Sequence, residues 1–343
     1  MNDLKGYSIK ATDWRAALQR NNSRTRNVII LFFLIYIAIG FILDLYLYTS
    51  YEQPLENTAS KLATFQILPL GSLGMLGVAG ISLIIAYYFH NRITMLGTEY
   101  REITADSSAL EERQLYNVIE ELKIASSLRF MPKIYIIEAN YMNAFASGLS
   151  EKSAMVAITR GLLEKLDRDE LQSVMAHEIS HIRHNDIRLT LMVLILSNIM
   201  LIVIDILFRF VLYSRNRKDN GLVIIILVVR FVLPILTLLL MLYLSRKREL
   251  MADAGCVELT RSNEPLARAL IKIHKDHLQN QETYQAVYSN TPHEEVRRAA
   301  YLYDPKYAGI TNLTSINALF STHPPLEERL KALGIENPHL GGD

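Results

Sequence analysis

Two histidines and a glutamate lie together in the stretch HEISH at residues 177–181. Apolar residues before and within this stretch recur at the spacing of one face of an α-helix. Residues four apart on a helix lie one above the other, so His177 and His181 could present imidazole nitrogens to a single metal ion. Glu178 would lie beside that ion, where its carboxylate could accept a proton from water. The stretch therefore predicts a zinc-dependent hydrolytic site.

A catalytic zinc site needs a third protein ligand and an open position for water. The later stretch SRKRELMADAG, at residues 245–255, places Glu249 and Asp253 four apart on a predicted helix. Glu249 could complete a set of two histidines and one glutamate around one Zn²⁺ ion. Asp253 could accept the ring N–H of a ligand histidine and so fix its tautomer. The alternative is that both acids form only a charged helix start beside lipid headgroups.

The composition is rich in apolar residues, since half of the residues are hydrophobic and 21% are charged. Such a balance favours a membrane protein over a purely soluble one. The net charge of +1 gives no electrostatic reason to expect a nucleic-acid partner. A single cysteine, Cys256, excludes an intramolecular disulfide and suits a reducing compartment. We expect Cys256 to be a packed side chain rather than a catalytic one.

Four apolar runs are long enough to cross a bilayer as helices. They cover about residues 28–48, 67–89, 189–213 and 222–244. Basic residues flank the first pair of runs and are scarce between them, so the positive-inside rule places the N-terminus and the next domain in the cytoplasm. The second run has a glycine at every third position, which predicts the close approach of another helix. These glycines are Gly71, Gly74, Gly77 and Gly80.

The predicted fold class is a mainly α integral membrane protein with four transmembrane helices and a cytosolic α+β, zincin-type metalloprotease domain. β-Prone pieces at 133–138, 143–148 and 154–160 predict a small sheet. Asp167 and Glu170 are typical of a capping box at the start of the HExxH helix. The predicted segments are a basic cytosolic leader at 1–27, a first transmembrane hairpin at 28–89, a first protease part at 90–187, a second hydrophobic hairpin at 188–245 and a second protease part at 246–343.

The two ligand-bearing stretches flank the second hydrophobic hairpin. His181 lies eight residues before the hairpin's apolar part and Glu249 lies five residues after it. Straight helices would hold these residues about 12 Å and about 8 Å from the hydrocarbon edge, on the same side. An antiparallel pair of long helices would then bring them together. Whether this hairpin crosses the bilayer completely stays open.

Three charged residues interrupt the second hairpin: Asp205, Arg209 and Arg230. Charges inside lipid must pair or face water, so these three could line a polar cavity or a substrate path. We favour the alternative in which Asp205 pairs with Arg209, four residues later, and Arg230 extends towards the headgroups.

Three motifs in order, HEISH, SRKRELMADAG and the terminal STHPPLEERL, make the chain resemble the HtpX-like membrane zinc proteases. These are relatives of the CAAX prenyl proteases among the gluzincin metallopeptidases, and the resemblance covers about residues 28–335. It implies that His177, His181 and Glu249 bind one zinc ion and that Glu178 is the general base. It also implies that Asp253 supports the ligand histidines.

The resemblance further matches NAFASG, at 143–148, to a family segment that forms an edge strand near the cleft. A bound substrate would then pair with this strand by strand addition, and the alternative is an ordinary surface strand. The residues concerned are Asn143, Ala144, Phe145, Ala146 and Ser147. His323 could stabilise an oxyanion, bind zinc in a latent state, or be a simple turn residue. Arg329 would orient that region, whereas His184 lies too far along its helix to join the other histidines at one ion.

The predicted function is a zinc-dependent endopeptidase in a bacterial cytoplasmic membrane, with its active site facing the cytoplasm. By resemblance, its substrates are misfolded or damaged membrane proteins. The expected partners are polypeptides and the lipid bilayer, with no nucleic acid, and a homo-oligomer is left open. One alternative is a protease that cuts inside the bilayer, but residues 183–186 are too polar for lipid. The other is a zinc-binding membrane scaffold or chaperone without turnover.

Overall fold

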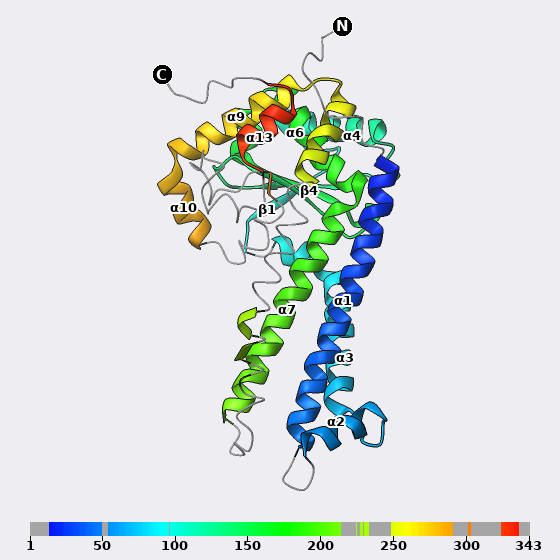
Figure 1. Ribbon diagram of the computed structural model, residues 1–343. Helices are drawn as coiled ribbons and strands as arrows, with labels where there is room; N and C mark the ends of the chain where they lie inside the picture. The colour runs from blue at the N-terminus through cyan, green and yellow to red at the C-terminus, as the bar shows by residue number, and fades with distance from the viewer. Residues whose placement is uncertain are drawn as a thin grey trace. The chain divides into compact units, whose positions relative to one another are not determined.

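The chain forms a mainly helical structure with one small mixed sheet, as seen in a computed structural model (Figure 1). The structure describes residues 14–49, 54–95, 97–213, 248–290, 301–302 and 324–335, with a few helical positions between 224 and 232. It divides into two compact units. The first comprises Met1–Asn22, His90–Leu191 and Met241–Asp343, and the second comprises Ser23–Phe89 and Met192–Leu240.

The second unit consists mainly of long apolar helices. Its helices with described bounds are α1 (Trp14–Tyr48), α2 (Leu55–Ala63), α3 (Leu70–Met95) and α7 (Asp186–Tyr213), of which α1, α3 and α7 also extend into the first unit. Among the described residues, two stretches are long and apolar enough to cross a membrane, Gln19–Tyr48 and Leu70–His90. They match the first two predicted spans. The predicted fourth span lies largely outside the described residues, so a total of four spans stays a prediction.

Helices α1 and α3 meet at a close contact near the start of α3. Asp44 of α1 is buried, and its carboxylate accepts hydrogen bonds from the backbone N–H groups of Gly71 at 2.6 Å and Ser72 at 2.8 Å. It thereby satisfies donors that a helix start leaves without intrahelical partners. A Cβ atom on Gly40 would lie 2.5 Å from the Cα atom of Ser72, so the close approach of α1 to α3 requires glycine at this position.

Among the described residues, the predicted close approach of another helix is found only at the first glycine of the series. A Cβ atom on Gly71 would lie 2.8 Å from the Gly40 carbonyl oxygen, but one on Gly74, Gly77 or Gly80 would meet no described atom within 4 Å. The reason is helical geometry: successive members of a three-residue series rotate by about 300°, so the series drifts around the helix instead of following one face.

The three charged residues of the second hydrophobic hairpin, Asp205, Arg209 and Arg230, pair with one another. The predicted Asp205–Arg209 pair is present, with Arg209 Nε 2.9 Å from Asp205 Oδ2. Arg230 does not extend away as predicted, because its Nη2 lies 2.7 Å from Asp205 Oδ1 and its guanidinium covers the Phe208 ring at 4.4 Å. A carboxylate shared by two guanidinium groups lowers the free energy of keeping all three in an apolar segment.

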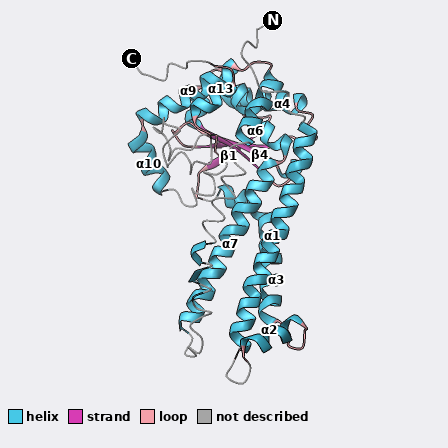
Figure 2. Ribbon diagram, in the orientation of Figure 1, coloured by secondary structure: helices cyan, strands magenta, loops and turns pink. Residues whose placement is uncertain are grey.

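A four-stranded sheet with the order β1-β2-β4-β3 lies in the first unit. Figure 2 shows its strands in magenta. The strands are β1 (Tyr100–Ile103), β2 (Lys133–Ile137), β3 (Ala144–Ser147) and β4 (Met155–Thr159). β2 and β4 are parallel, while β1 and β3 pair antiparallel with them at the two edges. The three predicted strands are present. β1 escaped prediction because only Ile103 of its four residues is buried, which leaves no alternating pattern.

Helix α6 (Arg168–His184) is the central helix of the first unit and packs against β3, α4 (Leu110–Ala125) and α9 (Glu264–Gln279). The predicted capping box is confirmed: Asp167 Oδ1 accepts from the Glu170 N–H at 2.8 Å, and Glu170 Oε2 accepts from the Asp167 N–H at 3.0 Å. The remaining helical elements of this unit in the described part of the chain are the 3-10 helix η1 (Glu151–Ser153), α5 (Arg160–Lys165), residues 248–260, α10 (Gln281–Asn290) and α13 (Leu326–Ala332).

Gly161, at the start of α5, packs directly against the backbone that precedes β3. A Cβ atom there would lie 2.1 Å from the carbonyl oxygen of Asn140, and its own N–H donates to Ala139 O at 3.0 Å. We expect Gly161→Ala to lower the free energy of unfolding by about 1–3 kcal/mol, because the backbone must shift to admit a methyl group. Thermal unfolding of the detergent-solubilised chain measures this loss. Gly77→Ala is the control, and equal melting temperatures for both variants would contradict the packing.

Candidate metal centre

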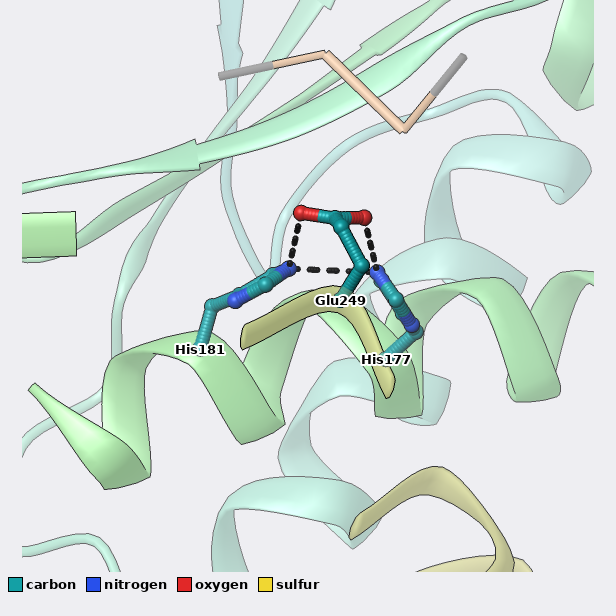
Figure 3. Close-up of side chains that lie close together, drawn as sticks. All are labelled: His177, His181 and Glu249. Atoms are coloured by element: carbon teal, nitrogen blue, oxygen red, sulfur yellow. Dashed lines mark hydrogen bonds and ion pairs between the residues drawn. The ribbon is translucent and has the colours of Figure 1, made fainter. Parts of the chain in front are cut away.

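Helix α6 and the helix at residues 248–260 bring together three side chains that could bind a metal ion, His177, His181 and Glu249 (Figure 3). The Nε2 atoms of His177 and His181 lie 3.1 Å apart. The Glu249 carboxylate lies between the two rings, with Oε2 3.6 Å from His177 Nε2 and Oε1 3.7 Å from His181 Nε2. All three ligand atoms lie within 4.8 Å of one another, so they could hold one metal ion.

Gly255 allows the two helices to come this close. A Cβ atom on Gly255 would lie 2.5 Å from Ser180 Oγ and 2.8 Å from Ser180 Cβ. The next residue, Cys256, is fully buried and its Sγ lies 3.1 Å from the carbonyl oxygen of Ser173 on α6. Burial raises the pKa of the Cys256 thiol, which agrees with a packed rather than a nucleophilic cysteine. The contact at Gly255 and Cys256 holds Glu249 opposite the histidines.

Asp253 holds the His177 ring. Its Oδ1 lies 2.9 Å from His177 Nδ1, and both residues are fully buried. Arg329 of α13 forms a two-pronged contact with the same carboxylate, with Nε 2.9 Å from Oδ2 and Nη2 2.6 Å from Oδ1. Burial raises the pKa of Asp253, but the charge of Arg329 and the bond to His177 outweigh it, so the pKa is lowered. Arg329 also contacts two candidate ligands directly, with Nη2 3.5 Å from His177 Nδ1 and Nη1 3.9 Å from Glu249 Oε2.

Asp186 is a site neighbour that the sequence did not single out. Both of its carboxylate oxygens lie 3.1 Å from His181 Nδ1. Burial lowers the pKa of His181, but the charge and hydrogen bond of Asp186 outweigh burial and raise it to about 9. The only signal in the sequence is an acidic residue five positions after the last HExxH histidine, on a different face if the helix continued.

Glu178 is buried at 1% exposure, and neither carboxylate oxygen has a hydrogen-bond partner among the described residues. Burial is the main cause that raises its pKa, against the lowering effect of the neighbouring histidines. An orphaned buried carboxylate is unfavourable unless another group completes its surroundings. Its position beside His177, His181 and Glu249 therefore fits a site that takes a cation and a water molecule.

Formal charges around the site also suit a cation. With both histidines neutral, as metal ligands must be, four buried carboxylates and two buried guanidinium groups leave a formal charge of −2 for a dication to cancel. The carboxylates are Glu178, Asp186, Glu249 and Asp253, and the guanidinium groups are Arg248 and Arg329.

The predicted substrate strand is present as β3, and all four of its residues are buried. Its outer edge is already paired within the chain: Phe145 forms an antiparallel bridge with Tyr301, and the Leu302 N–H donates to Ala144 O at 2.8 Å. Arg329 Nη1 in turn donates to the Leu302 carbonyl at 3.1 Å. Thus part of this edge is used by the protein itself.

The remaining predicted site residues have different outcomes. His323 lies outside the described residues. His184 is buried and is not among the three ligand candidates, His177, His181 and Glu249. Its carbonyl accepts from Asn21 Nδ2 at 3.1 Å, and burial lowers the pKa of its ring.

A helix that carries HExxH, opposed by a glutamate from a second helix, defines a metallopeptidase. Residues 109–336 match the family model described as "Peptidase family M48", and the chain belongs to this family. It is a membrane-associated metalloprotease, and the resemblance drawn from the sequence is confirmed.

Two bacterial relatives carry the description "Protease HtpX homolog". The protein of Helicobacter pylori strain Shi470 is 40% identical over 328 residues, which is 94% of this chain and 98% of the relative. The protein of Dictyoglomus thermophilum is 38% identical over 268 residues, which is 77% of this chain and 82% of the relative. Among solved structures, "Crystal Structure of S. mikatae Ste24p" aligns with a TM-score of 0.49 at 20% identity, over 80% of this chain and 60% of that one.

The Arg329–Asp253 contact predicts a large loss of stability when it is broken. Arg329→Gln leaves the Asp253 carboxylate buried without its cation, so we expect the free energy of unfolding to fall by about 3–5 kcal/mol. Arg168→Gln is the matched control, because Arg168 and its partner Glu121 are exposed and such pairs contribute about 0–1 kcal/mol. Denaturant unfolding of both variants measures the difference. Similar losses in the two variants would show that the buried pair contributes little.

Proposed function

We propose that His177, His181 and Glu249 hold one zinc ion and that Glu178 is the general base of peptide-bond hydrolysis. The observation that carries this proposal is the convergence of two imidazole Nε2 atoms and one carboxylate within 4.8 Å. Two nitrogen ligands and one oxygen ligand, with a further position left for water, are typical of catalytic zinc. When bound, zinc supplies a Lewis acid that acidifies water and polarises the scissile carbonyl.

Glu178 moves the proton in this mechanism. Its carboxylate accepts a proton from the attacking water and returns it to the leaving amine nitrogen. The absence of hydrogen-bond partners for Glu178 among the described residues leaves both oxygens available for this task. Burial raises its pKa, which makes the carboxylate a stronger base than one in water.

The Asp253 carboxylate and the Arg329 guanidinium hold the proposed ligand His177 in place. Asp253 accepts the Nδ1–H of His177, so the lone pair of Nε2 is left for the metal. Arg329 fixes Asp253 by its two-pronged contact and neutralises its charge.

We also propose that an extended polypeptide adds to the edge of β3, as the residues from Asn143 to Ser147 predict. The carbonyl of Ala144 already accepts from Leu302, so a substrate would pair with the later residues of β3 or replace Tyr301–Leu302. A role of His323 towards the oxyanion or the zinc ion stays part of this proposal.

The proposed setting is the bacterial cytoplasmic membrane, with the active site at its cytoplasmic face. Two candidate spans and the four apolar runs support four transmembrane helices, in hairpins at 28–89 and 188–245. The protease domain would comprise 90–187 and 246–343, with a leader at 1–27. The names of the relatives support proteolysis, and we propose misfolded or damaged membrane proteins as substrates.

Glu178→Gln tests the proposed mechanism. It keeps the size of the side chain but removes the base, so we expect the rate of casein cleavage to fall by about 10²- to 10⁴-fold at equal zinc content. The wild type, Glu178→Gln and the exposed control Glu282→Gln are purified in detergent, and their zinc is measured by metal analysis. Equal cleavage by all three would exclude Glu178 as the base. Zinc binding without cleavage by any of them would favour the scaffold.

A further inference from the structure

The carboxylate of Asp186 faces the side of the His181 ring that points away from the other ligands. Both of its oxygens lie 3.1 Å from Nδ1, whereas Nε2 of the same ring lies 3.1 Å from His177 Nε2 and 3.7 Å from Glu249 Oε1. A histidine that donates from Nδ1 to a carboxylate carries its lone pair on Nε2. The tautomer that Asp186 selects is therefore the one that can bind a metal on the side of Glu249.

We propose that Asp186 is the positioning residue of His181, the counterpart of Asp253 on His177. This inference rests on the proposed zinc site and adds to it a residue that sets the orientation and tautomer of the second ligand. With it, each of the two histidines has a carboxylate of its own on Nδ1, at 2.9 Å for His177 and 3.1 Å for His181.

A break between two helices brings Asp186 to this position. On one continuous helix, residues five apart are rotated by about 140°, so the side chain after the fifth step would face another way. Here α6 ends at His184, Asn185 adopts a left-handed conformation with φ of 56°, and α7 begins at Asp186. The change of direction at Asn185 is what allows Asp186 to reach back to His181.

Residues near the start of α1 hold this break. Asn21 is buried and its Nδ2 donates to the His184 carbonyl at 3.1 Å. Asn185 Nδ2 donates to Asn22 Oδ1 at 2.8 Å. A carbonyl at the end of a helix lacks an intrahelical partner, so these bonds satisfy and fix the turn.

The backbone of Asp186 is also tied to the segment that bears the third ligand. Arg248 Nη1 donates to the Asp186 carbonyl at 3.2 Å, and Arg248 directly precedes Glu249. Both Asp186 and Arg248 are buried. Asp186 therefore contacts the second ligand with its side chain and the segment of the third ligand with its main chain.

Zinc affinity is the direct measure of this role, because partners that orient ligand histidines typically contribute roughly 10- to 100-fold to metal affinity. We expect Asp186→Ala, in the full chain in detergent, to bind zinc roughly 10- to 100-fold more weakly in competition with a chelator. Asp186→Asn keeps an oxygen that can accept from Nδ1, so it should recover part of that loss. Its near-identical shape also keeps the test available if Asp186→Ala does not fold.

Asp169→Asn is the matched control, since Asp169 is an exposed acid in the first turn of the same helix α6. Its zinc affinity should stay within about twofold of the wild type. The absorption spectrum of the Co²⁺-loaded protein is the second readout, and it should change in Asp186→Ala but not in Asp169→Asn. A merely structural role would lower the melting temperature while leaving that spectrum unaltered.

The outcomes separate this inference from the zinc site itself. Wild-type affinity and an unchanged Co²⁺ spectrum in both Asp186 variants, with loss of binding in His177→Ala, would overturn only the role of Asp186. Equal affinity in the wild type and His177→Ala would overturn the zinc site, and the role of Asp186 with it.

Discussion

Direct contact between two helices at Ser180 and Gly255 is the constraint on which the site depends. Any side chain at Gly255 would overlap Ser180, so the glycine sets the distance between the helix of the histidines and the helix of Glu249. Cys256 adds a second contact to α6 through Ser173. Protein interiors are close-packed and deform little, so a short contact of this kind transmits its geometry to residues one or two turns away. The three ligand candidates meet because these backbones do.

Buried charge is the second constraint, and it is balanced pair by pair. Asp253 has Arg329 and Asp186 lies against His181, so two of the four buried acids near the site have a charged or hydrogen-bonding neighbour at close range. Glu178 differs because both of its oxygens lack a hydrogen-bond partner among the described residues. A buried carboxylate without a hydrogen-bond partner, beside groups that have theirs, is typical of a functional site.

The edge of β3 connects the site to the last part of the chain. Tyr301 and Leu302 pair with Phe145 and Ala144, and Arg329 binds the Leu302 carbonyl while it holds Asp253. One guanidinium thus links the strand edge to the neighbour of His177. The match to the model of peptidase family M48 covers residues 109–336 and so includes all of these residues. The terminal segment is therefore a structural part of the metalloprotease and not an appendage to it.

The HExxH helix, its capping box, three of the four strands and the acidic third ligand candidate were predictable from local periodicity and spacing. The sequence also identified the two described spans, since length and apolar character suffice for them. The contact of Asp186 with His181 depends instead on the left-handed turn at Asn185, and the ion pair of Arg230 with Asp205 depends on how their helical segments pack. The strand edge taken by Tyr301 and the contact of Gly255 with Ser180 also join residues far apart in the chain. Such contacts follow from how complete elements pack, and no local pattern of residues encodes them.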